Sequence, residues 1–273
     1  MNTTLPTGNR KPGRRAGLHP RRIASTGWLL ISLVTLIVAP FWLAGATGNA
    51  LWIAAPVAVT LLYVLARERR RCLAFYRSLW PRAWLPALGW ALLALATTLG
   101  FGNLIDRAPA GTPLDWSLGL LFNVHGDAGV NGFAIPLATP WLALLYVPPA
   151  LLSLPLLAWW EEEMFRRGTR GLRSACVRSV WFGLLHLTAG VSLGSCIALG
   201  AAGLLFSLVY WRALHSSSWA EARDELPPRA RSLLLPVGDG AQARETYAVY
   251  RATQVHLLYN VIGVLAIVAT SGI

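Results

Sequence analysis

The sequence has few charged residues. Only 13% of its 273 residues are Asp, Glu, Lys or Arg, whereas a soluble domain carries about 25%. Hydrophobic residues make up 55% of the chain, and the mean hydropathy is +0.50. This composition disfavours a soluble globular protein and predicts an integral membrane protein that lies in the lipid bilayer.

Several chemical motifs are also missing. The three cysteines are scattered and no CxxC pair occurs, so neither a thiolate zinc site nor a disulfide scaffold is indicated. The chain has no GxSxG and no glycine-rich phosphate loop, which disfavours a serine hydrolase and a nucleotide-binding enzyme. It also has no HExxH helix, which weakens the prediction of a zinc peptidase without excluding one.

Lysine is nearly absent, because Lys11 is the only one in a chain whose net charge is +12. A basic soluble chain would suggest nucleic acid as the partner. Here the arginines lie in loops between apolar segments, where they set membrane topology. We therefore expect no nucleic-acid partner.

The apolar segments predict an all-α, polytopic transmembrane helical bundle of about seven spans, with a range of six to eight. Residues 1–26 form a basic, disordered tail, 27–132 form N-terminal spans with an extracytoplasmic loop, and 133–273 form the domain that carries the candidate site. The fourth span is rich in proline, so we expect it to be kinked or re-entrant. The expected spans are 28–46, 50–66, 84–102, 133–160, 177–190, 193–214 and 253–273.

Arginine alternates between the loops on the two sides of this bundle. The N-terminal tail, the run at 67–82, the segment at 166–178 and the polar stretch at 215–252 are basic, and the intervening loops hold little positive charge. By the positive-inside rule, the N-terminus is cytoplasmic. We expect the stretch 215–252 to be a linker, with a gate over the site as the alternative.

Three glutamates follow the fourth apolar segment. Helical spacing pairs Glu162 with Arg166 and Glu163 with Arg167, four residues apart. Glu161 has no arginine at that distance. Ionisable residues at membrane depth are functional candidates, so Glu161 is the glutamate that we expect to be free for chemistry.

Two histidines and an asparagine stand in apolar helix. Phe182 precedes His186 by four residues, and His256 precedes Asn260 by four, so each pair shares a helix face. His186, His256 and Glu161 are predicted at similar depth, in a cavity that opens to the cytoplasmic side. Each motif also has a simpler interpretation. His186 would only pack against its neighbours, His256 and Asn260 would form an interhelical hydrogen-bonding pair, and the glutamates would form a solvated cluster of ion pairs with the arginines.

These three motifs, in this order, resemble the CPBP family, which includes the CAAX prenyl endopeptidases and the bacteriocin-processing and immunity-type membrane proteins. The resemblance covers residues 141–264, about half of the chain. The residues that carry it are Glu161, Glu162, Phe165, Arg166, Phe182, His186, His256 and Asn260.

The resemblance implies an intramembrane endopeptidase that acts on a peptide or a membrane protein. Glu161, assisted by His186, would activate a water molecule, and His256 with Asn260 would bind the oxyanion. No cofactor is favoured. Zinc is the alternative, because Glu161, His186 and His256 would form a two-histidine, one-carboxylate site.

The third glutamate allows a second register. In the preferred register Glu161 and Glu162 are the paired glutamates, and Glu162 binds Arg166 to hold the helix. In the other, Glu162 and Glu163 precede Arg167 and Gly168, which keeps the glycine common in the family but loses the aromatic residue before the arginine.

Two other functions remain open. A non-catalytic scaffold or immunity protein of the same fold would bind another membrane protein. A small transporter would use Glu161 and the histidines as a proton relay, but it is expected to contain an internal repeat, and none is visible.

Overall fold

The computed structural model describes residues 51–79, 84–105, 107, 112–115, 140–189, 191–226, 228–235 and 240–270. The basic tail and the first expected span lie outside these residues. The described part is helical and contains no strand, which confirms the all-α prediction there. Its longer helices are α2 (Leu51–Ser78), α3 (Trp84–Ile105), α5 (Pro140–Phe165), α6 (Leu172–Leu185), α7 (Leu193–Leu214) and α10 (Ala241–Thr270).

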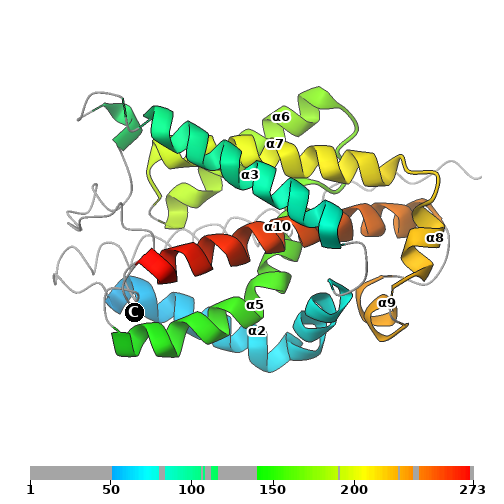
Figure 1. Ribbon diagram of the computed structural model, residues 1–273, viewed down its shortest axis with the longest axis horizontal. Coiled ribbons are helices and arrows are strands. Elements are labelled where there is room, and N and C mark those ends of the chain that lie inside the picture. Colours follow the sequence, from blue (N-terminus) through cyan, green and yellow to red (C-terminus); the bar gives the residue numbers. More distant parts are fainter. Residues whose placement is uncertain are drawn as a thin grey trace, which may run out of the picture.

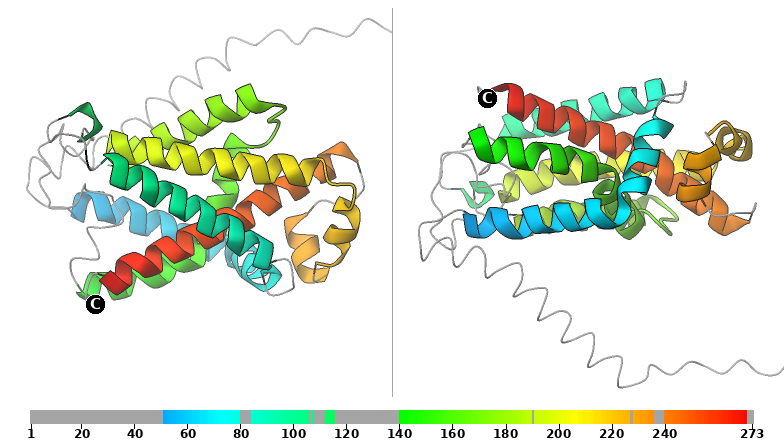
Figure 2. Two further views of the ribbon diagram at one scale, coloured as in Figure 1. Left: turned by 45° about the horizontal axis from the view of Figure 1, so that its top comes forward. Right: turned by 90° about the horizontal axis from the view of Figure 1, so that it is seen from below.

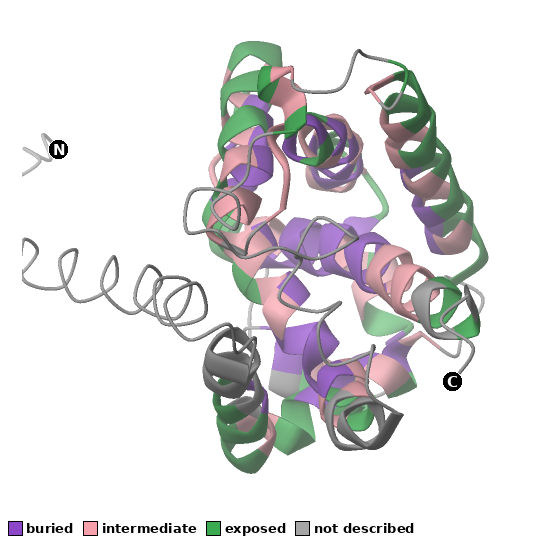
Figure 3. Ribbon diagram, turned by 90° about the vertical axis from the view of Figure 1, so that its left-hand side faces the viewer, coloured by how far each residue is buried: buried purple, intermediate pink, exposed green. Residues whose placement is uncertain are grey.

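Helix α10 is the central element of the bundle. It packs against α3 and α7 on one side and against α5 on the other, and α5 in turn packs on α2 (Figure 1). Helix α6 lies on the outer side of α7 (Figure 2). The buried surfaces of the helices face one another, and their exposed surfaces face outward (Figure 3).

Two helices of the described residues, α3 and α7, are long and apolar enough to cross a membrane. Helix α3 also turns large apolar side chains outward, which is unusual for a surface in water. These observations fit membrane association, but the predicted total of seven spans is not confirmed. The exposed leucines of α3 are Leu85, Leu92, Leu93, Leu99 and Leu104.

Helix α5 continues through three prolines. Pro155 has no N–H, so the carbonyl of Leu151 loses its usual helical donor. The hydroxyl of Tyr76, on α2, donates a hydrogen bond to that carbonyl instead. A side chain from a neighbouring helix thus satisfies the backbone at the proline and joins α2 to α5.

Several helices extend beyond the expected spans. Helix α6 begins at Leu172 rather than near 177, because the Ser174 hydroxyl accepts hydrogen bonds from the N–H groups of Arg170 and Gly171. Helix α6 has 14 residues and the 3-10 turn His186–Ala189 adds four, so together they make 18, within the range of about 17–25 residues of a spanning segment. Helix α2 extends beyond 66 to Ser78, with non-helical dihedral angles at Glu68.

The interpretation of 215–252 as a linker is also wrong. It contains α8 (Trp219–Asp224), α9 (Pro228–Leu234) and the first turns of α10. We call α8 and α9 the cap. Arg223 and Arg244 lie over the ring of Trp219, with guanidinium carbons 5.4 and 5.5 Å from its centroid. The cap and its neighbours share a buried cluster: Ala74, Phe75, Trp219, Leu226, Leu234, Leu235, Ala243, Tyr247 and Tyr250.

Helices α6 and α7 approach each other closely through small residues. A Cβ atom on Gly183 would lie 2.1 Å from the Cys196 carbonyl oxygen, and one on Gly200 would lie 3.2 Å from the Ser179 carbonyl oxygen. Small residues of this kind let helix backbones pack tightly in membranes. This contact fixes the position of Phe182, which lies next to Gly183 and points into the site.

Candidate functional site

The end of α5 carries the glutamates and arginines. The predicted ion pairs are confirmed: Glu162 Oε2 lies 3.3 Å from Arg166 Nε, and Arg167 Nη2 donates to Glu163 Oε2 over 3.0 Å. The chain leaves the helix through Gly168, whose φ of +74° lies in the left-handed region that favours glycine. This turn separates the two ion pairs from α6.

The structure brings both site glutamates to His256, on α10. Its Nδ1 lies 2.9 Å from Glu162 Oε1, and its Nε2 lies 3.4 Å from Glu161 Oε2. The side chains of Glu162 and His256 are 0% and 2% exposed, whereas that of Glu161 is 30% exposed. The Nδ1 contact is within hydrogen-bond distance, so Glu162 is the hydrogen-bond partner of the ring, while Glu161 lies within ion-pair distance of its other nitrogen.

Aromatic rings enclose His256 on two sides. The ring of Phe206, on α7, stacks on it with centroids 4.6 Å apart and an interplanar angle of 22°. The ring of Phe182 meets it nearly edge-on at 5.5 Å. Phe206 was not predicted as a site residue, since nothing in the sequence pattern distinguishes it from the other apolar residues of α7.

His186 also lies beside the ring of Phe182. Its Nδ1 is 2.8 Å from the Phe182 carbonyl oxygen, which can only accept, so Nδ1 carries the proton and Nε2 is the acceptor in the neutral ring. Its ring centroid is 4.9 Å from that of Phe182. This confirms the predicted shared face. Among the described residues, however, no hydrogen bond or ion pair joins His186 to Glu161.

Asn260 lies one helical turn beyond His256 on α10 and is partly buried. The continuous helix confirms that the two residues share a face. Both ring nitrogens of His256 point to glutamates in this arrangement. A role for His256 as an oxyanion donor beside Asn260 therefore requires that one of these contacts opens.

Arg166 is fully buried. Its guanidinium lies over the ring of Phe182, 4.8 Å from the centroid, and 5.9 Å from the centroid of Phe165. Gly203, on α7, leaves the room that this side chain needs, because a Cβ there would lie 3.1 Å from Arg166 Nη2. Within the described part of the chain, its guanidinium nitrogens have no hydrogen-bond partner besides the ion pair with Glu162.

Metal binding has limited support from the geometry. Among the described residues, no three His, Cys, Asp or Glu side chains come close enough to hold a metal ion. The zinc site of Glu161, His186 and His256 would need His186 to move toward the other two. The zinc alternative stays a prediction.

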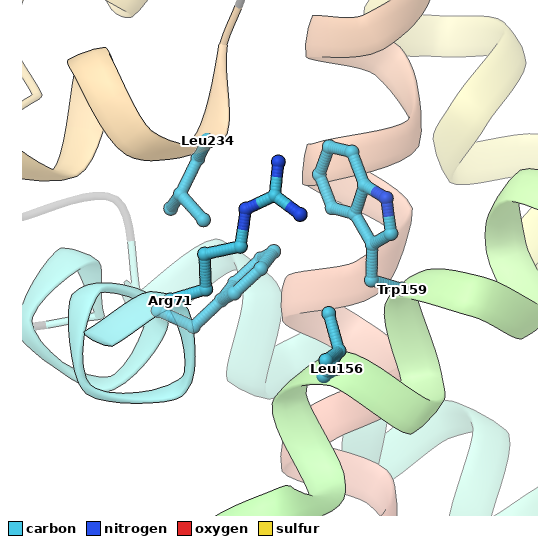
Figure 4. A pocket seen from close by; sticks show the side chains of 5 residues that line it. Arg71, Leu156, Trp159 and Leu234 are labelled. Atoms are coloured by element: carbon cyan, nitrogen blue, oxygen red, sulfur yellow. The ribbon is translucent and has the colours of Figure 1, made fainter. Parts of the chain in front are cut away.

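A small cavity lies between α2, α5 and α9. It measures about 20 Å³ and contains none of the predicted site residues, although Trp159 precedes Glu161 by two positions on α5. Figure 4 shows the Arg71 side chain extending between Leu234 and Trp159. A cavity of this volume has room for about one water molecule.

Comparison with known proteins gives no further assignment. No family model, curated protein or solved structure matches the chain.

Proposed function

We propose that the chain is a membrane-embedded endopeptidase that hydrolyses a peptide bond with a water molecule activated by Glu161. The observation that carries this proposal is the contact of one buried histidine, His256, with a buried glutamate and with a second glutamate that is partly exposed. Such an arrangement holds a carboxylate beside a proton donor in a site of low dielectric. General acid–base catalysis needs both groups within hydrogen-bond reach.

The membrane location belongs to the same proposal. We infer about seven spans with a cytoplasmic N-terminus, and a site that opens to the cytoplasmic half of the bilayer. The alternation of arginine-rich loops supports this topology. The apolar helices α3 and α7 and the outward-facing leucines of α3 support burial in lipid.

Each residue then has a defined task. Glu162, held by Arg166, accepts the hydrogen bond of His256 Nδ1–H and orients the ring. Glu161 takes a proton from water as the hydroxide attacks the peptide carbonyl. The carboxyl group of Glu161 afterwards gives this proton to the leaving amine. Asn260, with His256 once its Nε2–H is released from Glu161, stabilises the oxyanion.

His186 is assigned a supporting task. Its unprotonated Nε2 can accept a hydrogen bond from the attacking water, if that water lies between α6 and α5. Mutation of a single oxyanion donor typically lowers the rate by about 10²–10³. A comparable loss is expected for Glu161→Gln, which removes the base.

The test compares new protein termini in host membranes that carry the wild-type chain, Glu161→Gln or Glu163→Gln at matched levels. Glu163 is the matched control, because it lies on the same helix and its carboxylate pairs with Arg167 outside the buried cluster. Fragments that appear with the wild type and with Glu163→Gln, but not with Glu161→Gln, would support the peptidase. A chelator added to active membranes separates zinc from metal-independent chemistry.

A non-catalytic scaffold is the second candidate. The contacts of His256 favour this function, because both of its ring nitrogens already contact carboxylates within the bundle. A buried network of this kind can fix the relative position of α5 and α10 without chemistry. Identical termini in all three membranes, with each protein folded and inserted, would support the scaffold.

A further inference from the structure

We propose that the arginine-rich turn of α2, residues 67–71, binds the headgroups of anionic phospholipids at the membrane interface. This proposal rests on the membrane location proposed above and is independent of peptidase activity. It assigns a ligand to a charged surface that the candidate active site does not include.

The turn has an excess of positive charge that its own residues do not neutralise. Four arginines and Glu68 give a net charge of +3, that is, four less one. The Glu68 carboxylate lies 3.9 Å from Arg67 Nε and 3.6 Å from Arg71 Nη1. Arg69 and Arg70 are exposed, and neither forms an ion pair within the described residues.

The position of the turn along α2 matches the edge of a bilayer. The preceding part of the helix exposes Val59, Leu62 and Tyr63, which are 66%, 57% and 57% exposed. The arginines begin one helical turn later, and Arg67 Nη1 donates to the Tyr63 hydroxyl over 2.8 Å. A helix that passes from hydrocarbon into the headgroup region is expected to present apolar side chains first, then a tyrosine and then arginines.

The backbone gives this turn a shape that can hold a headgroup. Glu68 has φ −120° and ψ 16°, so the helix is interrupted in the middle of the arginine run. An open hollow of about 430 Å³ is lined by residues 66–71. Guanidinium groups bind phosphate through paired N–H donors, which a lipid phosphodiester accepts.

A simpler role for these arginines is to set topology, which requires positive charge but no headgroup binding. The two roles differ in a measurable way. Topology depends on the total positive charge of a loop, whereas a binding surface depends on which arginines carry it. In a headgroup site the arginines that line the site bind the phosphate through paired N–H donors, so they contribute to lipid affinity and exposed arginines elsewhere on the same side do not.

The experiment measures the binding of phosphatidylglycerol and of phosphatidylcholine with identical acyl chains to the full chain in detergent micelles, by native mass spectrometry. The variants are Arg69→Gln with Arg70→Gln, and, as a matched control, Arg170→Gln with Arg173→Gln. All four arginines are exposed. We expect the wild type to prefer phosphatidylglycerol, the first variant to lose about tenfold of that preference, and the control to stay within about twofold.

Two results would overturn the proposal: equal binding of the two lipids by the wild type, or an equal loss in both variants. A salt series on the wild type is independent of the folding of any variant. A preference that does not fall between 50 and 500 mM salt (about a threefold shortening of the Debye length) would also count against a headgroup site. Recovery of the chain without detergent in the soluble fraction would instead contradict the membrane location.

Discussion

Two Glu–Arg pairs lie side by side at the end of α5 and have opposite environments. Glu162 and Arg166 are both 0% exposed, whereas Glu163 and Arg167 are 37% and 27% exposed. The residue types and the spacing of four are the same. Sequence spacing therefore determines which side chains pair, while the surrounding helices determine how much each pair contributes to stability.

The two clusters also differ in their third partner. The buried pair is completed by His256 and covered by aromatic rings. The outer pair is completed by Glu245, whose Oε2 lies 3.7 Å from Arg167 Nη1, and by the Thr246 hydroxyl, which accepts from Arg167 Nη2 over 2.9 Å. Both clusters connect α5 to α10. Removal of one partner from the buried cluster would leave a charge that water cannot reach, whereas in the outer cluster water would solvate the remaining charge.

The largest expected effect comes from breaking the buried pair. Arg166→Met removes the guanidinium and leaves the Glu162 carboxylate buried, so the free energy of unfolding should fall by about 3–5 kcal/mol. Arg167→Met, its exposed counterpart, should lower it by no more than about 1 kcal/mol. Denaturant titration in micelles, followed through the fluorescence of the 13 tryptophans, measures both. Equal losses of unfolding free energy in the two variants would show that burial does not determine how much each pair contributes to stability.

A smaller effect is expected from crowding the buried cluster. A Cβ on Gly203 would lie 2.7 Å from Phe182 Cδ1 and 3.1 Å from Arg166 Nη2. Gly203→Ala should therefore lower the free energy of unfolding by about 1–3 kcal/mol through overpacking. Gly168→Ala, near the exposed pair, meets nothing closer than 3.9 Å, and its effect of about 1–2 kcal/mol comes from the positive φ alone.

The combination with Arg166→Met distinguishes these two mechanisms. Gly203→Ala should be partly relieved when the guanidinium is absent, because the clash with Nη2 disappears. Gly168→Ala should add to Arg166→Met without coupling, since it acts on the backbone of the turn. Additive behaviour of Gly203→Ala would show that Arg166 does not occupy the space that this glycine leaves.

The sequence was sufficient for the local part of the site. Helical periodicity predicted both ion pairs and the shared face of Phe182 and His186, because these contacts join residues on one helix. Glu161 and His256 were predicted to lie at a similar depth in the membrane, but their direct contact was not predicted. Its geometry depends on the packing of α5 against α10, which no local pattern encodes.

The errors have the same origin. The cap was expected to be a linker because its polar residues mask a few large apolar ones, such as Trp219 and Leu234, that become buried only against α2 and α10. Phe206 and the Tyr76 hydroxyl act through tertiary contacts with His256 and with the Leu151 carbonyl. Because most of the chain is apolar, the sequence does not distinguish the apolar residues that make specific tertiary contacts from the others.

The smallest expected effect concerns the exposed pair itself. A double-mutant cycle with Glu163→Gln and Arg167→Gln should give a coupling energy of about 0.2–1 kcal/mol, because water and salt screen both groups. The cycle with Glu162→Gln and Arg166→Gln should give a larger value. Raising the salt concentration should reduce the first coupling and leave the second nearly unchanged, since ions do not reach fully buried groups. Equal salt sensitivity in the two cycles would mean that solvent reaches Glu162, and the low-dielectric site that the proposed chemistry requires would then be absent.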